Sequence, residues 1–286
     1  MSMSSRVVVL TGATSGIGEA TARGLLRRGA HVIMAVRDTR RGADLKRALV
    51  GELPQASIDI VECNLASRRS VDACADVIYS RYDALDVLIN NAGTMLRRPH
   101  MAESGFERTF ATNHLGHFQL TGRLLPLLIH DDRVSQVVTV ASSVHRRAEL
   151  PLEELRHVRG YNMWRAYARS KLANVMFSNA LARRFEHTNL RANCLHPGMI
   201  ASRILPRKSL WWRTLSALGA GLGVLSDPQR GAATSLYLAL DPAASNLNGQ
   251  YLDPHQIPRA CAAVARSHGQ QEHLWALSAA ATGLKE

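Results

Sequence analysis

Two side chains in the second half of the chain have the types and the spacing for proton transfer. Tyr167 and Lys171 stand four positions apart in a stretch with helical periodicity, so both side chains leave the same face of that helix. A free phenol has a pKa of ~10, which is high for proton transfer at neutral pH, and a nearby ammonium favours the phenolate. We therefore predict that Tyr167 exchanges a proton with a substrate and that Lys171 lowers the pKa of its phenol.

The choice of lysine at this position is informative because the chain otherwise prefers arginine. Only four of the 35 basic residues are lysines, which leaves 35 − 4 = 31 arginines. A compact ammonium can contact two ribose hydroxyls and join a proton relay, a role that a planar guanidinium does not easily replace. Lys171 therefore favours a chemical role for the pair over an incidental place on an amphipathic helix.

A glycine-rich turn near the N-terminus has the form of a nucleotide-binding loop. A predicted strand is followed by Thr11-Gly12-Ala13-Thr14-Ser15-Gly16-Ile17-Gly18, which begins a predicted helix. Gly12 permits a tight turn, Gly16 lets the backbone approach a pyrophosphate, and Gly18 allows close packing of the helix on the strand. The helix N-terminus adds N–H donors and the positive end of a dipole. This context favours dinucleotide binding over an ordinary glycine-rich turn.

The residues at the end of the second predicted strand indicate which dinucleotide is bound. An acidic residue there would accept a hydrogen bond from the ribose 2′-hydroxyl of NAD. This chain has Arg37 instead, followed by Asp38, with Arg40 and Arg41 close by. A guanidinium matches a 2′-phosphate with two parallel hydrogen bonds, so we predict NADP(H). Asp38 keeps NAD as the alternative, and the arginines could instead be a solvated face of an arginine-rich chain.

These residues need a scaffold in which strands and helices alternate. Apolar, β-branched runs predict strands at residues 6–11, 31–36, 58–62, 85–90, 134–141 and 190–196. Helical periodicity between them predicts helices over 16–28, 70–82, 104–129 and 167–186. Such alternation implies right-handed crossovers and a parallel sheet that is covered on both faces. The predicted fold class is α/β: a Rossmann-type, doubly wound, three-layer sandwich with a mainly parallel sheet of about seven strands.

Beyond residue 197 the alternation loosens, but no linker separates a second core. We expect a substrate lid at about 203–227, a helix from 227 to about 240, a last strand near 251 and a helical tail at about 255–286. The chain is thus predicted to be a single domain over residues 1–286.

The T-G-x-x-x-G-I-G form of the glycine-rich turn resembles the short-chain dehydrogenase/reductase family, and the resemblance continues over about residues 6–252. Further matches follow in the family's order: Asn90-Asn91-Ala92-Gly93, Asn113, Ser142, Tyr167-Ala168-Arg169-Ser170-Lys171 and Pro197-Gly198. The resemblance implies hydride transfer between nicotinamide and a carbonyl carbon. Tyr167 would move the proton, Ser142 would hydrogen-bond the carbonyl oxygen, and Asn113 would hold a water that links Lys171 to solvent.

The same resemblance extends the set of cofactor-binding residues. After the third strand the family usually has Asp-Leu, whereas this chain has Asn64-Leu65, whose amide oxygen can still accept a hydrogen bond from adenine. Ser142 falls in the catalytic place of the fifth strand, with Ser143 as the alternative. The expected cofactor-binding residues are Gly12, Thr14, Ser15, Gly16, Ile17, Gly18, Arg37, Asn64, Leu65, Asn91, Ala92, Gly93, Tyr167, Lys171, Pro197, Gly198, Ile200 and Ser202.

Within the family, His114-Leu115-Gly116-His117-Phe118 and His196-Pro197-Gly198 look like the retinol dehydrogenase and protochlorophyllide reductase-like branch. That branch implies a lipophilic aldehyde or ketone as substrate. The apolar segment 210–225, with Trp211 and Trp212, would be the lid over such a substrate. The alternative is that this segment makes a weak contact with a membrane surface.

Composition excludes several other classes of protein. The 46% hydrophobic content rules out a disordered chain, and the net charge of +12 favours anionic partners. We expect no nucleic acid as partner, because no basic stripe is interleaved with aromatic residues. The four cysteines form no C-x-x-C pair, and His114 with His117 lacks a third ligand, so no metal site is expected and packing roles are favoured for these histidines.

The sequence thus predicts an NADP(H)-dependent aldehyde or ketone reductase, or alcohol dehydrogenase. The alternative is a non-catalytic NADP(H)-binding sensor or scaffold protein, which would not need an intact Ser142, Tyr167 and Lys171 set. The resemblance also implies a homodimer or homotetramer that pairs through the long helices after residues 104 and 167. We expect a cytoplasmic location.

Overall fold

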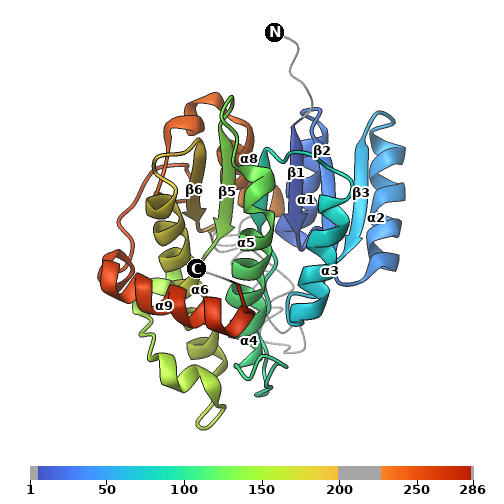
Figure 1. Ribbon diagram of the computed structural model, residues 1–286. Helices are drawn as coiled ribbons and strands as arrows, with labels where there is room; N and C mark the ends of the chain where they lie inside the picture. The colour runs from blue at the N-terminus through green and yellow to red at the C-terminus, as the bar shows by residue number, and fades with distance from the viewer. Residues whose placement is uncertain (1–5, 199–226, 285–286) are drawn as a thin grey trace.

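Seven parallel strands form the middle layer of the molecule. The computed structural model describes residues 6–198 and 227–284, and its sheet has the order β3-β2-β1-β4-β5-β6-β7 (Figure 1). Every neighbouring pair is parallel. The strands are β1 (Val7–Thr11), β2 (His31–Val36), β3 (Ser57–Glu62), β4 (Val87–Asn90), β5 (Ser135–Val140), β6 (Leu190–Leu195) and β7 (Tyr251–Leu252). The order reverses between β1 and β4, which confirms the doubly wound fold class predicted from the sequence.

Helices cover both faces of this sheet. Side chains of α1 (Gly16–Leu26), α2 (Thr39–Glu52) and α8 (Pro228–Leu240) share one apolar core with Val8 and Leu10 of β1. The next residue of that strand, Val9, faces the opposite core with side chains of α3 (Arg68–Tyr79), α5 (Gly116–Leu128) and α6 (Met163–Arg184). Successive side chains of a strand point to opposite faces, so a strand buried on both sides must be apolar throughout.

Several element bounds differ from those expected. The predicted helix over 104–129 is divided into α4 (Arg108–Phe110), a π-helical turn (Ala111–Leu115) and α5. Helix α6 begins at Met163, before Tyr167, because the Asn162 side chain accepts a hydrogen bond from the Arg165 N–H at 3.0 Å and caps it. In the tail, a short 3-10 turn (Ala263–Arg266) precedes α9 (His268–Thr282).

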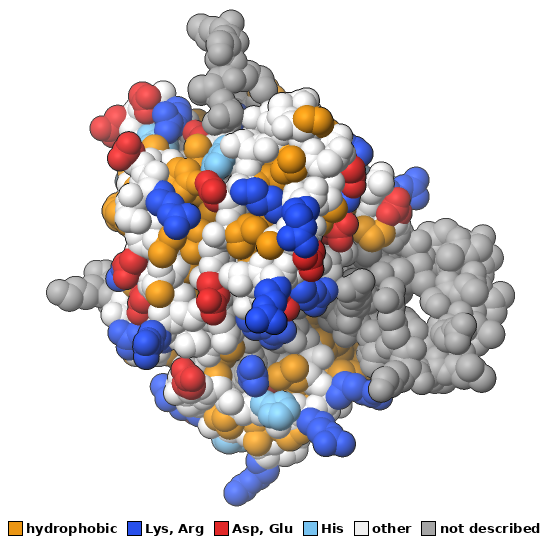
Figure 2. Space-filling view, turned by 90° about the vertical axis from the view of Figure 1, so that its right-hand side faces the viewer, with side chains coloured by type: hydrophobic (Ala, Val, Ile, Leu, Met, Phe, Trp, Pro, Cys, Tyr) orange, Lys and Arg blue, Asp and Glu red, His pale blue; other side chains and the backbone are white. Residues whose placement is uncertain are grey.

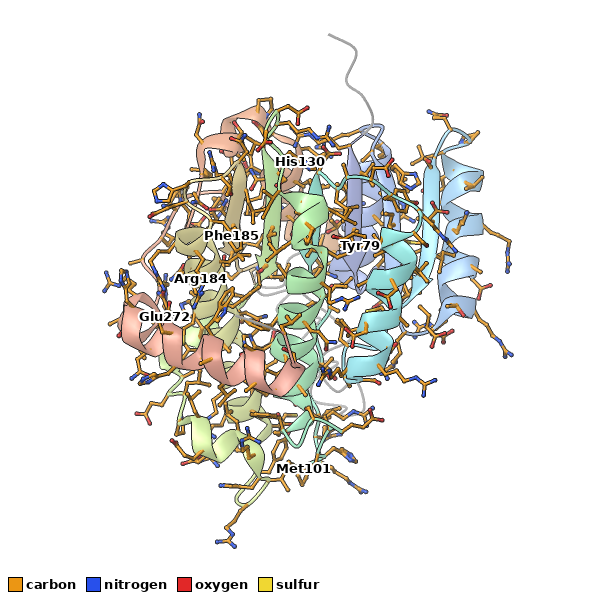
Figure 3. The ribbon with its side chains drawn as sticks, in the orientation of Figure 1. Tyr79, Met101, His130, Arg184, Phe185 and Glu272 are labelled. Atoms are coloured by element: carbon orange, nitrogen blue, oxygen red, sulfur yellow. The ribbon has the colours of Figure 1, made fainter. Side chains whose placement is uncertain are left out.

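Helix α9 lies across α5 and α6 (Figure 1). Its Trp275 ring packs against Phe118 of α5 and Phe177 of α6, with centroid distances of 4.9 and 6.0 Å. Figure 3 shows Glu272 of α9 beside Arg184 of α6, with which it forms an ion pair at 2.5 Å. The tail is therefore packed on the core of the domain.

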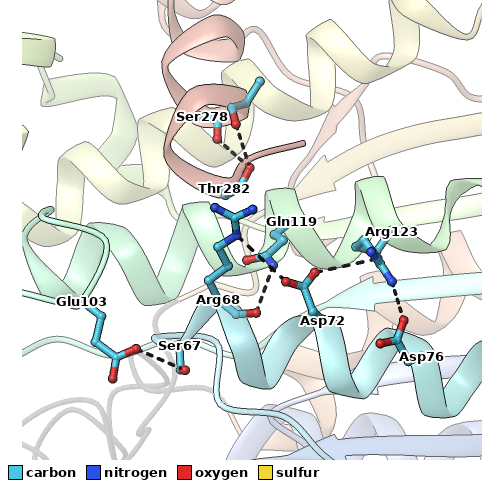
Figure 4. A network of polar contacts seen from close by, with 10 residues as sticks. Ser67, Arg68, Asp72, Asp76, Glu103, Gln119, Arg123, Ser278 and Thr282 are labelled. Carbon is cyan, nitrogen blue, oxygen red and sulfur yellow. Dashed lines mark hydrogen bonds and ion pairs between the residues drawn. The ribbon is translucent and has the colours of Figure 1, made fainter. Parts of the chain in front are cut away.

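Polar contacts connect α3 to α5 next to the end of α9 (Figure 4). The Gln119 amide donates to the Arg68 carbonyl at 3.0 Å, and Arg123 forms ion pairs with Asp72 and Asp76. These contacts lie on the outer side of the helical layer. Across the described ranges, 6–198 and 227–284, no helix is both long and apolar enough to span a bilayer.

Candidate active site

The predicted site residues meet where the strands of the parallel sheet end. Met101, which follows β4, lies at the lower end of the molecule in Figure 3, and His130, which precedes β5, lies at the opposite end. The lower end therefore holds the carboxyl ends of the strands, where open α/β sheets bind their ligands. Figure 2, seen from the α2 edge, shows more Lys and Arg than Asp and Glu side chains at this lower end. Such a surface suits an anionic ligand.

The structure brings Ser142, Tyr167 and Lys171 together. Ser142 follows the end of β5, and its side chain lies close enough to the Tyr167 phenol to lower the pKa of that phenol. The Lys171 Nζ atom lies 5.7 Å from the centroid of the Tyr167 ring and donates to the Val140 carbonyl at 2.8 Å. Ser143, the alternative to Ser142, is exposed. The shared helix face of tyrosine and lysine predicted from their spacing is thus observed.

The lowered phenol pKa expected from the sequence is wrong for this site. Burial raises the pKa of Tyr167 to about 12, and the nearby Ser142 hydroxyl only partly offsets that rise. Burial also lowers the pKa of Lys171 to about 8. Both shifts have the same cause, because removal from water disfavours the charged form of either group. At neutral pH the phenol therefore keeps its proton, and Lys171 remains mostly an ammonium.

Asn113 is positioned by the π-helical turn between α4 and α5. Its side-chain amide accepts from the Thr94 N–H at 2.7 Å and donates to the Thr94 carbonyl at 2.9 Å. It also donates to the Ser170 hydroxyl at 2.9 Å, next to Lys171 on α6. A Cβ at Gly93 would lie 3.6 Å from the Lys171 Nζ atom, so the absence of a side chain there leaves room beside the ammonium. Asn113 thus connects the loop after β4 to the helix of the tyrosine–lysine pair.

The glycine-rich turn fits a dinucleotide. Gly12 and Gly16 have φ values of +69° and +55°, in the left-handed region that favours glycine. A Cβ at Gly16 would meet no atom within 4 Å, whereas one at Gly18 would lie 2.0 Å from the Gly12 carbonyl oxygen. Ser15 caps α1 without a side-chain hydrogen bond, so its hydroxyl does not compete for the N–H donors of the first turn. The turn therefore combines an accessible backbone at Gly16, a helix packed closely on the strand at Gly18, and free N–H donors in the first turn of α1. Thr14 and Ile17 are partly exposed beside them.

The loop after β4 packs against this turn. The Thr11 hydroxyl accepts from the Asn91 and Ala92 N–H groups, each at 3.0 Å. The Asn91 side-chain amide donates to the Thr11 carbonyl at 2.8 Å. A Cβ at Gly12 would lie 2.7 Å from the Ala92 Cα atom, so only glycine fits there without displacing the loop. The two cofactor-binding segments predicted at residues 11–18 and 90–93 are hence one unit in space.

The arginine at the end of β2 is exposed, and its acidic neighbour is engaged. Asp38 caps α2 by accepting from the Arg41 N–H at 3.1 Å. Arg37 is exposed, and within the described ranges it forms no ion pair. Because the cap occupies one carboxylate oxygen, Asp38 has less capacity to accept a hydrogen bond from a ribose hydroxyl. The arrangement favours recognition of a phosphate by Arg37.

The remaining predicted residues are placed as follows. The Asn64 side-chain oxygen accepts from the Ala66 N–H at 3.2 Å, and the Leu65 carbonyl lies against Gly116 of α5. Gly198 has a φ of +85° after Pro197, beyond the end of β6. Ile200, Ser202 and the predicted lid lie outside the described residues, apart from Asp227 at the start of α8.

The buried histidines have hydrogen-bond partners within the protein. The His114 Nε2 atom lies 2.8 Å from the Ser278 hydroxyl of α9, and the His117 Nε2 atom lies 2.9 Å from the Thr11 hydroxyl. In the part of the chain that the structure describes, no cluster of three potential metal ligands occurs. His145, in the 3-10 turn after Ser142, donates from Nδ1 to the Ser142 carbonyl at 2.7 Å and accepts from the Ala262 N–H at 3.2 Å. Sequence reasoning missed this support of Ser142, because residue 262 is far away along the chain.

The chain is similar to known proteins along most of its length. A family model described as short chain dehydrogenase matches residues 6–211. Retinol dehydrogenase 14 of Mus musculus is 38% identical over 302 residues, which cover 99% of this chain and 87% of that protein.

Solved structures share the fold. An uncharacterized protein from Mycobacterium Paratuberculosis is 36% identical, with a TM-score of 0.78, and the match covers 97% of this chain and 93% of that one. A complex of Pseudomonas aeruginosa RhlG with NADP at the active site is 26% identical, with a TM-score of 0.73 and coverage of 88% and 95%.

Proposed function

This chain belongs to the short-chain dehydrogenase family, in its retinol dehydrogenase-like branch, and we propose that it is an NADP(H)-dependent reductase of lipophilic aldehydes or ketones, working in reverse as an alcohol dehydrogenase. Its family makes it an oxidoreductase. The observation that carries the proposal is the juxtaposition of Ser142, Tyr167 and Lys171 beside a glycine-rich turn that fits a dinucleotide. A non-catalytic sensor or scaffold has no need of this juxtaposition.

In this mechanism the side chains supply a proton and stabilise charge. The bound cofactor would supply the hydride. Tyr167, which is protonated at neutral pH, donates to the oxygen of the substrate carbonyl as negative charge develops there. An alkoxide is a much stronger base than a phenolate, so transfer of the proton from the phenol is downhill. Ser142 hydrogen-bonds the same oxygen, and the Lys171 ammonium favours the phenolate that remains.

The NADP(H) preference rests on Arg37, and its substitution tests that preference. We expect Arg37→Gln to lower kcat/KM for NADPH by at least about tenfold, the loss of one charged hydrogen-bonding partner, and to leave kcat/KM for NADH nearly unchanged. Arg47→Gln is the matched control, because Arg47 is an exposed arginine of α2 that pairs with Asp44 at 2.6 Å. Steady-state rates with both cofactors decide the matter. Equal losses with NADPH and NADH would contradict a contact with the 2′-phosphate.

The substrate class can be tested by NADPH oxidation with aldehydes and ketones of increasing chain length. Longer, apolar carbonyl compounds should give the higher kcat/KM, because burial of apolar surface contributes about 0.8 kcal/mol per CH₂. NADPH binding without turnover on any compound would favour the sensor or scaffold. The lid at about 203–227 and the membrane-surface contact of segment 210–225 stay predictions, because of these residues the structure describes only Asp227.

The homodimer or homotetramer also stays a prediction, and we propose that it does not use the face of α5 and α6 beneath α9. There α9 places Trp275 on Phe118 and Phe177 and pairs Glu272 with Arg184, so these side chains are already covered within one chain. Hydrogen–deuterium exchange should therefore show α5, α6 and α9 equally protected at low and high protein concentration. Protection of α5 and α6 that grows with concentration, with rapid exchange in α9, would refute this arrangement.

A further inference from the structure

We infer that His117 is a positioning residue that connects the nucleotide-binding turn to Asn113, an assignment that rests on the proposed function. His117 is the second residue of α5 and follows Gly116, which caps the π-helical turn. It is 1% exposed. Its Nδ1 atom lies 2.8 Å from the Asn113 carbonyl oxygen, and its Nε2 atom lies 2.9 Å from the Thr11 hydroxyl. One ring thus contacts both the end of β1 and the segment that holds Asn113.

The partners of the ring determine which nitrogen carries its proton. A carbonyl oxygen only accepts, so the Nδ1 atom of His117 must donate to Asn113. Burial lowers the pKa of His117 to about 4, with the positive charge of Lys171 acting in the same direction, so the ring is neutral. In a neutral ring the Nε2 atom is then the acceptor, and the Thr11 hydroxyl donates to it.

The Thr11 hydroxyl is fully used in this arrangement. Its oxygen accepts from the Asn91 and Ala92 N–H groups at 3.0 Å each. Two acceptors are within reach of its proton, the His117 Nε2 atom at 2.9 Å and the Ile89 carbonyl at 3.3 Å, and the proton goes to the nearer one, His117. These hydrogen bonds form a series that runs in one direction. The loop after β4 donates to Thr11, Thr11 donates to His117, and His117 donates to the Asn113 carbonyl. A series with a single orientation fixes the relative positions of its members more tightly than separate contacts would.

The series ends beside the tyrosine–lysine pair. The main chain of Asn113 receives the His117 hydrogen bond, and its side chain bonds Thr94 and the Ser170 hydroxyl. Ser170 precedes Lys171 on α6. A shift of the nucleotide-binding turn would consequently displace Asn113 as well, and the two halves of the site are expected to respond together.

His114 offers a matched control in the same segment. It is also 1% exposed, and it packs against Phe110 and Phe118 at centroid distances of 5.1 and 6.1 Å. Its Nε2 atom contacts Ser278 of α9 instead of the nucleotide-binding turn. Phenylalanine at either position therefore replaces a buried imidazole by a buried apolar ring, but only His117 joins the two halves of the site.

The test compares His117→Phe, His117→Asn and His114→Phe in the full chain. We measure the Kd for NADPH by fluorescence without substrate, and kcat with a carbonyl substrate, each per folded molecule. His117→Phe should raise the Kd at least about fivefold and lower kcat at least about tenfold, the scale of losing a buried hydrogen-bond partner. His117→Asn, whose amide can still donate to the Asn113 carbonyl, should recover most of kcat but not the Kd. His114→Phe should leave both within about twofold.

The outcomes separate this proposal from a purely structural role and from the proposed function. If His117→Phe lowers only the melting temperature, with Kd and kcat per folded molecule unchanged, the assignment is overturned. Failure of His117→Asn to restore kcat above His117→Phe would likewise refute the link to the Asn113 carbonyl. Since the Kd is measured without substrate, a chain that binds NADPH but reduces nothing would defeat the proposed function and still report on His117.

Discussion

Tyr167→Phe should lower turnover by about 10³-fold and leave the Kd for NADPH within about threefold of the wild-type value. The substitution removes only the phenolic oxygen, and the ring keeps its place on α6 beside Lys171. Without that oxygen neither neighbour can deliver a proton to the substrate in its place, because Ser142 is a far weaker acid and the Lys171 ammonium is held by the Val140 carbonyl. Initial rates of NADPH oxidation and a binding titration measure the two quantities.

Tyr82→Phe is a suitable control for the loss of a phenolic oxygen. Tyr82 follows α3, and its hydroxyl donates to Asp59 of β3, away from the carboxyl ends of the strands. Its removal should affect stability and leave kcat per folded molecule within about twofold. More than a tenth of wild-type turnover in Tyr167→Phe would show that another group delivers the proton, and the proposed role of this tyrosine would have to be abandoned.

The parts of the site that the sequence predicts well depend on neighbours along the chain. Helical spacing alone places Tyr167 and Lys171 on one face, and strand–turn–helix context alone identifies Gly12, Gly16 and Gly18 as a turn with open backbone. Strand positions follow from runs of buried apolar residues, so the six strands expected in the first two-thirds of the chain are all present. Such patterns predict the structure well because they depend only on residues close together in the sequence.

The parts that were missed depend on contacts between distant residues. The pKa of Tyr167 is set by how deeply the finished fold buries the phenol, and the spacing to Lys171 carries no information about that burial. The π-helical turn and the contact between His117 and Thr11, 106 positions apart, exist only once α5 packs beside β1. The sequence predicts that the tail is helical. It does not predict that α9 packs on α5 and α6, because that contact depends on three segments far apart along the chain.

Lys171→Met should lower turnover about as much as Tyr167→Phe does. It should also reveal the free energy that burial of the ammonium costs the folded protein. The pKa of Lys171 is about 8 in the folded protein against 10.5 for a free lysine. Between these values the unfolded chain binds more protons than the folded chain, so the contribution of Lys171 to stability rises with pH from about 8 to about 10.5 and is constant below that window. The full rise is about 3 kcal/mol, since each pKa unit corresponds to ~1.4 kcal/mol. The methionine variant lacks this titration.

Urea unfolding of both proteins at neutral pH and at pH ~10 measures the effect, because all other titrating groups cancel in the difference between them. At neutral pH we expect Lys171→Met to be about as stable as wild type: relief from the buried charge offsets the lost hydrogen bond to the Val140 carbonyl. At the higher pH the wild-type protein should gain about 2–3 kcal/mol relative to the variant. A difference that does not change with pH would mean that Lys171 titrates as a solvated lysine, and an ammonium so hydrated could not stabilise the Tyr167 phenolate through a water-poor site.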